Sequence, residues 1–184
     1  MPVMRLGRAQ TWGWAEAVEA SGETDASLRR KLERGQVALP TTEGGRTRVT
    51  LKDIAVLRVS RHLCDLGFQV ERAFGLAKFA VKELDGADDH VLLYLLTSRS
   101  AAGPGGVRVL RFDMTDPGKR AEARRELLHA LHDARNVLVP IQGLISDAFY
   151  TLPDLPSDVA KRLQTWSANI EVLQSDIRAK GREN

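Results

Sequence analysis

The chain lacks several features that would tie it to a particular class of protein. Cys64 is its only cysteine, which excludes an intrachain disulfide and a thiolate metal cluster. No apolar run approaches the length needed to span a bilayer, and the first residues contain no apolar signal core. We therefore expect a cytoplasmic protein with no membrane partner. Cys64 follows apolar helical neighbours, so we interpret it as a buried structural thiol, with a redox switch as the alternative.

The composition is that of a globular protein with an uneven distribution of charge. The chain has 184 residues, enough for one large domain or two small ones, and 43% of them are hydrophobic. Residues 1–82 contain 14 basic and 9 acidic residues, an excess of +5, whereas residues 83–184 contain 13 and 15, a balance of −2. The excess positive charge therefore lies in the N-terminal half, where it would attract a polyanion such as DNA.

Residues 22–68 have the pattern of a DNA-binding segment. We expect a short helix over about 12–21, a turn at Gly22, a basic helix over 24–34, and a hairpin with its tip at Gly44-Gly45. A helix and a β-ribbon are the elements that fit DNA grooves, and positive charge on both attracts phosphates. The residues that we expect to contact DNA are Thr24, Ser27, Arg29, Arg30, Lys31, Arg34, Arg46 and Arg48. The alternative is a solvated basic helix face.

The same segment resembles the winged helix-turn-helix of MerR-type regulators over about residues 10–82. The motifs that carry the resemblance are a Leu28-Arg29 pair, a wing tip at Gly45-Arg46, Asp53 opening the next helix, and Leu66-Gly67-Phe68 closing it. In place of the family's aromatic pair after Leu-Arg, the chain has Arg30-Lys31. The resemblance implies a head that binds double-stranded DNA.

The rest of the head is predicted to be helical. Thr50 is an N-cap for a helix over about 51–66, and a further helix is expected over about 70–84. Residues 85–89 break the pattern and indicate a domain boundary. Trp12 and Trp14 would pack the first helix onto this head, and Trp14 has the stronger claim because it lies on the apolar face.

The middle of the chain predicts a β-hairpin. Residues 90–96 and 107–112 are aliphatic runs separated by a Gly-rich loop over 98–106. An isolated hairpin is only marginally stable, so this one should pack against a helix or pair with the hairpin of a second copy. The loop could cradle a phosphate, but no Lys-Ser or Lys-Thr follows it, so we interpret it as a connector.

The C-terminal part predicts two long helices that pair. Asp116-Pro117 opens the first helix, whose apolar spacing continues to Ala148, and Ser157 caps the second. Apolar residues advance along both by threes and fours, and the ones expected to form a dimer seam are Leu131, Leu138, Ile141, Ile145, Leu163, Trp166, Ile170 and Leu173. Two such helical hairpins bury their seams as a homodimeric four-helix bundle.

A second resemblance falls on the first of these helices. The run from His132 to Gly143 is similar to the H-box of sensor histidine kinases, which opens the first helix of a dimeric bundle, although Val137 stands where that family has proline. The resemblance implies His132 as a phosphoacceptor, Asp133 as its general base and Asn136 as an orienting residue. No ATP-binding domain accompanies the box, so we favour a dimerisation device that is not an enzyme.

We therefore expect a mainly α protein with a small β content: a winged helix-turn-helix head over 1–84, a linker and β-hairpin over 85–115, and a helical-hairpin dimerisation domain over 116–184. The expected function is a homodimeric regulator of transcription that binds double-stranded DNA without a cofactor or metal. His129 and His132 have the spacing of a helical metal pair, but no third ligand accompanies them. The alternatives are a phosphotransfer or signalling adaptor, in which His132 serves a separate histidine kinase or a response-regulator receiver domain, and an excisionase-like factor that bends DNA.

Overall fold

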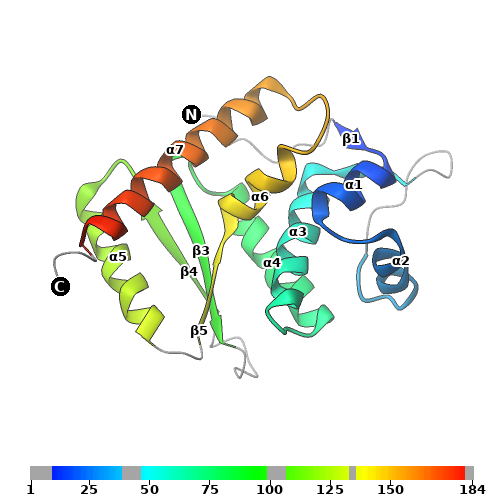
Figure 1. The fold of residues 1–184 in the computed structure, drawn as a ribbon, viewed down its shortest axis with the longest axis horizontal. Coiled ribbons are helices and arrows are strands. Elements are labelled where there is room, and N and C mark those ends of the chain that lie inside the picture. Colours follow the sequence, from blue (N-terminus) through cyan, green and yellow to red (C-terminus); the bar gives the residue numbers. More distant parts are fainter. Residues whose placement is uncertain (1–9, 39–46, 99–106, 133–135, 181–184) are drawn as a thin grey trace. The chain divides into compact units, whose positions relative to one another are not determined.

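The computed structural model describes residues 10–38, 47–98, 107–132 and 136–180. The described residues form seven helices and five short strands, which confirms a mainly helical chain with small antiparallel sheets (Figure 1). The chain divides into two compact units. Unit 1 contains residues 1–86 with 147–154, and unit 2 contains residues 87–146 with 155–184.

Unit 1 is built from four helices and one two-stranded ladder. The helices are α1 (Trp14–Ser21), α2 (Asp25–Glu33), α3 (Leu51–Asp65) and α4 (Val70–Asp85), and the strands are β1 (Thr11–Trp12) and β2 (Val49–Thr50). β1 and β2 pair antiparallel, with Trp12 opposite Val49. All four helices begin and end within two residues of the expected positions, and α1 begins at Trp14 because the chain is extended at Thr11–Trp12.

The packing of α3 and α4 forms the centre of unit 1. Thr50 and Asp53 form a capping box at the start of α3, in which each side chain accepts a hydrogen bond from the backbone N–H of the other. Ile54, Leu57 and Leu63 of α3 are at most 1% exposed. Cys64, one position further, is half-buried, and this burial raises the pKa of its thiol.

We expected Trp14 to pack the first helix onto unit 1 more than Trp12 does, and the structure shows the reverse. Trp12 is buried, and its indole N–H donates to the carbonyl oxygen of Pro153 at 3.1 Å. Trp14 is only half-buried, at the first position of α1. The reason is the short strand β1, because pairing with Val49 turns Trp12 toward the core before the helix begins.

Unit 2 contains a three-stranded antiparallel sheet in the order β4-β3-β5. Its strands are β3 (Val91–Ser98), β4 (Val107–Asp113) and β5 (Asn136–Pro140). The hairpin of β3 and β4 was predicted, but not as part of a larger sheet. β5 pairs with the other edge of β3, with Leu95 opposite Val139. Residues 85–115 therefore do not form a separate connector, because their strands share a sheet with a segment more than 20 residues further on.

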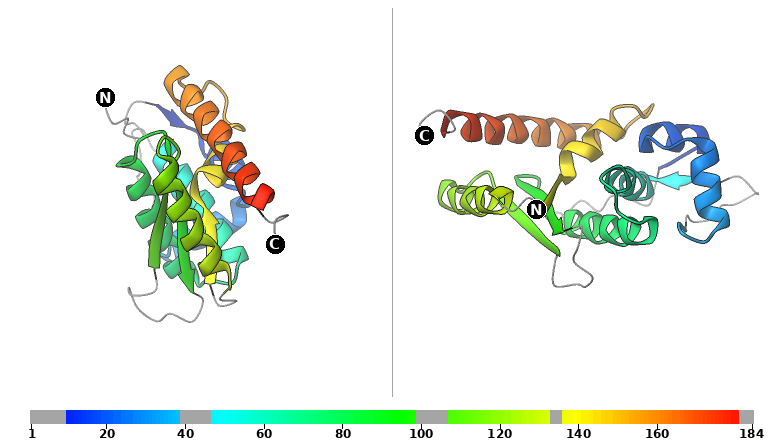
Figure 2. Two further views of the ribbon diagram at one scale, coloured as in Figure 1. Left: turned by 90° about the vertical axis from the view of Figure 1, so that its left-hand side faces the viewer. Right: turned by 60° about the horizontal axis from the view of Figure 1, so that its bottom comes forward.

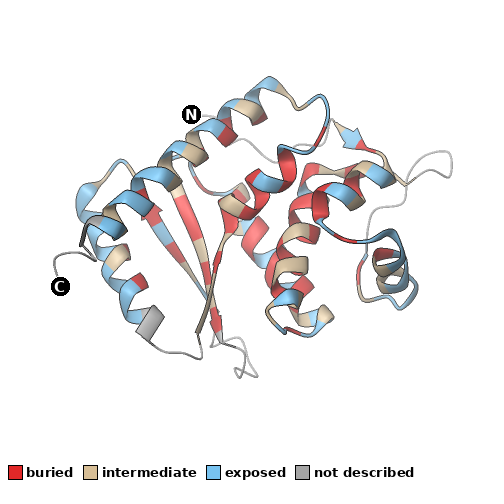
Figure 3. Cartoon of the chain, viewed as in Figure 1, coloured by how far each residue is buried: buried red, intermediate tan, exposed pale blue. Residues whose placement is uncertain are grey.

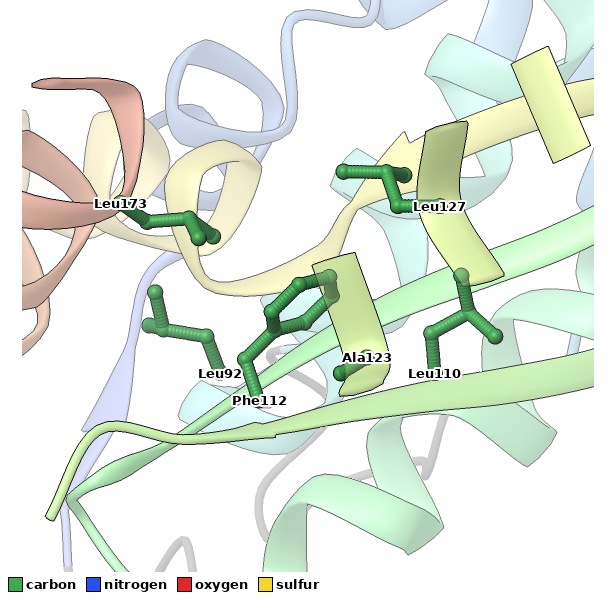
Figure 4. Packing of buried hydrophobic residues seen from close by; sticks show 6 residues of the cluster. All are labelled: Leu92, Leu110, Phe112, Ala123, Leu127 and Leu173. Atoms are coloured by element: carbon green, nitrogen blue, oxygen red, sulfur yellow. The ribbon is translucent and has the colours of Figure 1, made fainter. Parts of the chain in front are cut away.

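Two helices cover one face of this sheet. They are α5 (Pro117–His132) and α7 (Ser157–Lys180), and Asp116 caps α5 by accepting from the backbone N–H groups of Gly118 and Lys119. They contribute Ala123, Leu127 and Leu173 to a core with the sheet residues Leu92, Leu110 and Phe112 (Figures 2 and 4). Near the start of α5, Arg120 pairs with Asp176, near the end of α7, at 3.2 Å, so the helices run antiparallel.

The prediction of one continuous helix from 117 to about 148 is wrong. α5 ends at His132, β5 occupies Asn136–Pro140, and α6 (Ile141–Phe149) follows directly. Proline disfavours helical backbone at the residue before it, and Val137 and Val139 are β-branched. The apolar spacing that indicated a helix was shared by chance between a strand and the helix after it. The residues that resemble an H-box therefore do not lie on one helix, because His132 ends α5 and Asn136 lies in β5.

Most of the residues that we expected to form a dimer seam are instead buried within a single chain. Ile141, Ile145, Leu163, Trp166 and Leu173 are at most 1% exposed. Figure 3 shows buried residues in red on α6. Ile170 and Leu138 are partly buried against the unit 2 core. These side chains cannot form a bundle with a second copy unless the unit opens. The side chain of Leu131 lies outside the described residues.

Candidate nucleic-acid interface

The basic helix α2 is joined to α1 by a turn of three residues. Gly22 ends α1 in the left-handed region with φ 72°, and its N–H donates to the carbonyl oxygen of Glu19 at 3.0 Å. Thr24 then caps α2, because its hydroxyl oxygen accepts from the N–H of Ser27 at 3.2 Å. The φ of Gly22 favours glycine, and a β-carbon there would lie 2.6 Å from Nη1 of Arg58, so the end of that side chain would have to move.

A buried carboxylate fixes the inner side of α2. The Glu23 side chain is 1% exposed and forms an ion pair with Lys31. Its Oε2 also accepts a hydrogen bond from the Ser27 hydroxyl at 2.9 Å and lies 3.8 Å from a guanidinium nitrogen of Arg61 in α3. Leu28 is fully buried on the same side. α2 is thus held to the rest of unit 1 by a charged network and an apolar anchor.

The outer side of α2 carries the exposed basic groups. Arg29, Arg30 and Arg34 are exposed, and so is Arg48, just before β2. Among the described residues, the side chains of Arg30, Arg34 and Arg48 make no ion pair and no hydrogen bond. Of the residues expected to contact DNA, these arginines and the N-cap Thr24 lie at the surface, whereas Lys31 and Ser27 point inward to Glu23. Arg46 and the hairpin tip lie outside the described residues.

Arg29 is held by two neighbours. Its Nε donates to Asp25 Oδ1 at 3.0 Å and Oδ2 at 2.9 Å, and its guanidinium carbon lies 5.3 Å from the centroid of the Trp14 ring. The Trp14 indole N–H donates to the same Asp25 carboxylate. The hydrogen bond from Arg29, followed by that from Trp14, lowers the pKa of Asp25, and the same carboxylate raises the pKa of Arg29. Both groups stay charged across the physiological pH range.

An open groove lies along this surface. It has a volume of about 590 Å³ and is lined by Gly13, Trp14, Arg29, Leu32, Glu33, Thr47 and Arg48. One wall is the outer face of α2, and the other is the stretch that leads into β2. Arg29 and Arg48 line opposite walls of the groove, and the Asp25 carboxylate offsets the charge of Arg29.

Sequence reasoning missed the residues that organise this surface. Glu23 was placed in the turn without a role, and Asp25 and Trp14 were not connected to Arg29. The spacing of Asp25 and Arg29 is that of an i, i+4 pair, which was available in the sequence. The contact with Trp14 was not, because it depends on the angle between α1 and α2.

The candidate phosphoacceptor His132 lies at the edge of the described residues. His132 is the last residue of α5, and its side chain and Asp133 lie outside the described residues. Across the described part of the chain, no three His, Cys, Asp or Glu side chains form a group that could hold a metal ion. His129 is exposed on α5.

No protein-family model and no curated protein sequence matches the chain. None of the helices in the described ranges combines the length and the apolar character needed to cross a membrane.

Proposed function

We propose that the protein binds double-stranded DNA through α2 and regulates transcription as a homodimer, in the manner of MerR-type regulators. The observation that carries this proposal is the two-sided construction of α2. Its inner side is fixed by Leu28 and the buried Glu23, and its outer side presents the exposed residues Arg29, Arg30 and Arg34. A rigid helix with a basic outer side suits insertion into the major groove.

The neighbouring elements support the same function. A three-residue turn containing glycine is typical of a helix-turn-helix. Arg48, across the groove from α2, adds an exposed positive charge on a second element, which supports contact with a phosphate backbone. The excess of +5 in the first 82 residues adds an attraction that does not depend on DNA sequence.

A homodimer follows from the size of the reading element. α2 has nine residues, and one such helix reaches only a few base pairs, so two copies on paired half-sites are needed for specificity. Since the predicted seam is buried, we place the contact between copies on apolar side chains of α5 and α7 that stay exposed, Leu128 at 43% and Val172 at 46%. The two antiparallel helices from each copy would then form a four-helix arrangement outside the sheet.

DNA binding is tested by fluorescence anisotropy with duplex DNA at increasing salt. Each phosphate contact contributes about −0.9 to the slope of log affinity against log salt, so a dimer lacking one arginine per copy should lose about 2 from that slope. We expect this for Arg30→Ala, Arg34→Ala and Arg48→Ala. Arg125→Ala on α5 removes an equally exposed arginine from unit 2 and should leave the slope unchanged. Equal slopes for all four variants would contradict DNA binding through α2.

The oligomeric state is tested by sedimentation velocity. We expect the wild type to be dimeric and the double variant Leu128→Ser/Val172→Ser to be monomeric. Phe79→Ser removes a comparably exposed side chain from unit 1, and we expect that variant to stay dimeric. A wild type that is monomeric at all concentrations would contradict the homodimer. A large bend in the bound DNA together with no effect on transcription would indicate an architectural factor instead of a regulator.

A further inference from the structure

Arg29 differs from the other exposed arginines of α2 in being held in place. Its Nε is engaged by both oxygens of Asp25, and its guanidinium lies over the Trp14 ring, yet 60% of its side chain is exposed. Its two terminal nitrogens make no hydrogen bond to any residue that the structure describes. The side chain is therefore ordered before it meets a ligand and still has two parallel donors available.

This arrangement is poorly suited to a phosphate. A phosphate contact depends on net positive charge, and the Asp25 carboxylate cancels the charge of Arg29 and repels a phosphate beside it. Arg30 and Arg34 have no such carboxylate among the described residues, so they are better phosphate ligands. A neutral acceptor pair avoids this repulsion. In the major groove, the neutral pair that matches two terminal guanidinium nitrogens is O6 and N7 of guanine.

We propose that Arg29 reads a guanine in each half-site and that Asp25 and Trp14 are positioning residues for this contact. The inference rests on the proposed function and adds the base that the protein selects. Because Asp25 and Trp14 order the Arg29 side chain before DNA binds, less side-chain entropy is lost on binding. Since Asp25 offsets the charge of Arg29, the pair contributes to sequence preference more than to overall affinity.

The experiment begins with selection of binding sites from a pool of duplexes with a randomised region, using the full-length wild type. The guanine assigned to Arg29 is then replaced by 7-deazaguanine, which lacks the N7 acceptor but still pairs with cytosine. Binding is compared for the wild type, Arg29→Ala, Asp25→Ala, Trp14→Leu and Glu33→Ala. The last variant is the matched control, because Glu33 is a carboxylate of the same helix that influences Arg29 only through its charge.

We expect the wild type to bind the 7-deazaguanine duplex roughly 5- to 150-fold more weakly, the range of discrimination of a bidentate base contact. Arg29→Ala should bind both duplexes equally. Asp25→Ala and Trp14→Leu should lose most of the difference while their salt slopes stay at least as steep as that of the wild type. Glu33→Ala should retain the difference, which separates loss of the hydrogen bonds from loss of a negative charge.

The remaining outcomes contradict the inference in distinguishable ways. Salt-dependent binding without a selected guanine would overturn the guanine contact and leave DNA binding in place. A selected guanine whose replacement affects wild type and Arg29→Ala equally would assign the contact to another residue. Equal behaviour of Asp25→Ala and Glu33→Ala would remove the positioning role. Failure of the wild type to bind any duplex would overturn the proposed function together with the inference.

Discussion

Gly22→Ala tests whether the turn before α2 needs glycine for two separate reasons. The residue has φ 72°, and an added β-carbon would lie 2.6 Å from Nη1 of Arg58. Gly35, just after α2, has φ 67° but no atom within 4 Å of its added β-carbon. The pair of substitutions therefore separates the cost of the backbone conformation from the cost of the contact.

The expected magnitudes follow from these two terms. Alanine in the left-handed region costs about 1–2 kcal/mol, partly offset by about 0.4–1 kcal/mol because alanine restricts the unfolded chain. Gly35→Ala should thus lower the free energy of unfolding by about 1 kcal/mol. At position 22 the end of Arg58 must also move to a less favourable rotamer, which adds about 0.5–1.5 kcal/mol. Gly22→Ala should cost about 2 kcal/mol.

Native-state hydrogen exchange at the most protected amides of α3 measures the free energy of unfolding of unit 1. Asparagine tolerates the left-handed region, so Gly35→Asn should be close to the wild type, while Gly22→Asn should keep the conflict with Arg58. Equal losses at positions 22 and 35 would refute the contact with Arg58. No loss at either position would refute the whole argument.

Three further predictions concern charge and packing. Glu23→Gln should lower the free energy of unfolding of unit 1 by about 3 kcal/mol, because it leaves the Lys31 ammonium, 14% exposed, without its buried carboxylate partner, and hydrogen exchange in α3 measures this. Leu173→Ala should lower the free energy of unfolding in urea by about 2–5 kcal/mol, whereas Gln174→Ala at the exposed next position of α7 should lower it by less than about 0.5 kcal/mol; similar losses would contradict the α7 packing. The pKa of Asp25, followed by carboxyl NMR, should lie below 3.8 and return toward it in Arg29→Ala. Because the folded pKa is depressed, the stabilising contact is complete above pH 3.8 and is lost as pH falls through the folded pKa.

The helices of unit 1 could be predicted because their ends are encoded locally. Gly22, Thr24 and Thr50 specify where α1 stops and where α2 and α3 start, through a left-handed backbone and two N-caps. The exposed arginines of α2 were predicted for the same reason, since a helix of known register has a known outer side. Lys31 was misassigned because its partner Glu23 lies eight residues earlier, beyond the reach of helical spacing.

The amino-acid sequence by itself determined the local elements of this protein: the capped helices of unit 1, the β3–β4 hairpin, the starts of α5 and α7, and the basic character of α2. Only the tertiary structure decided that Asn136–Pro140 is a strand, because a short apolar run such as Val137–Val139 is compatible with helix or strand until a sheet edge such as β3 pairs with it. The same holds for the apolar positions of α7. Their spacing predicts a buried face, but whether a second copy or the sheet of the same chain buries it depends on contacts between residues far apart in the sequence. Hydrophobic burial is non-directional, so the apolar pattern alone does not determine which surface covers this face of α7.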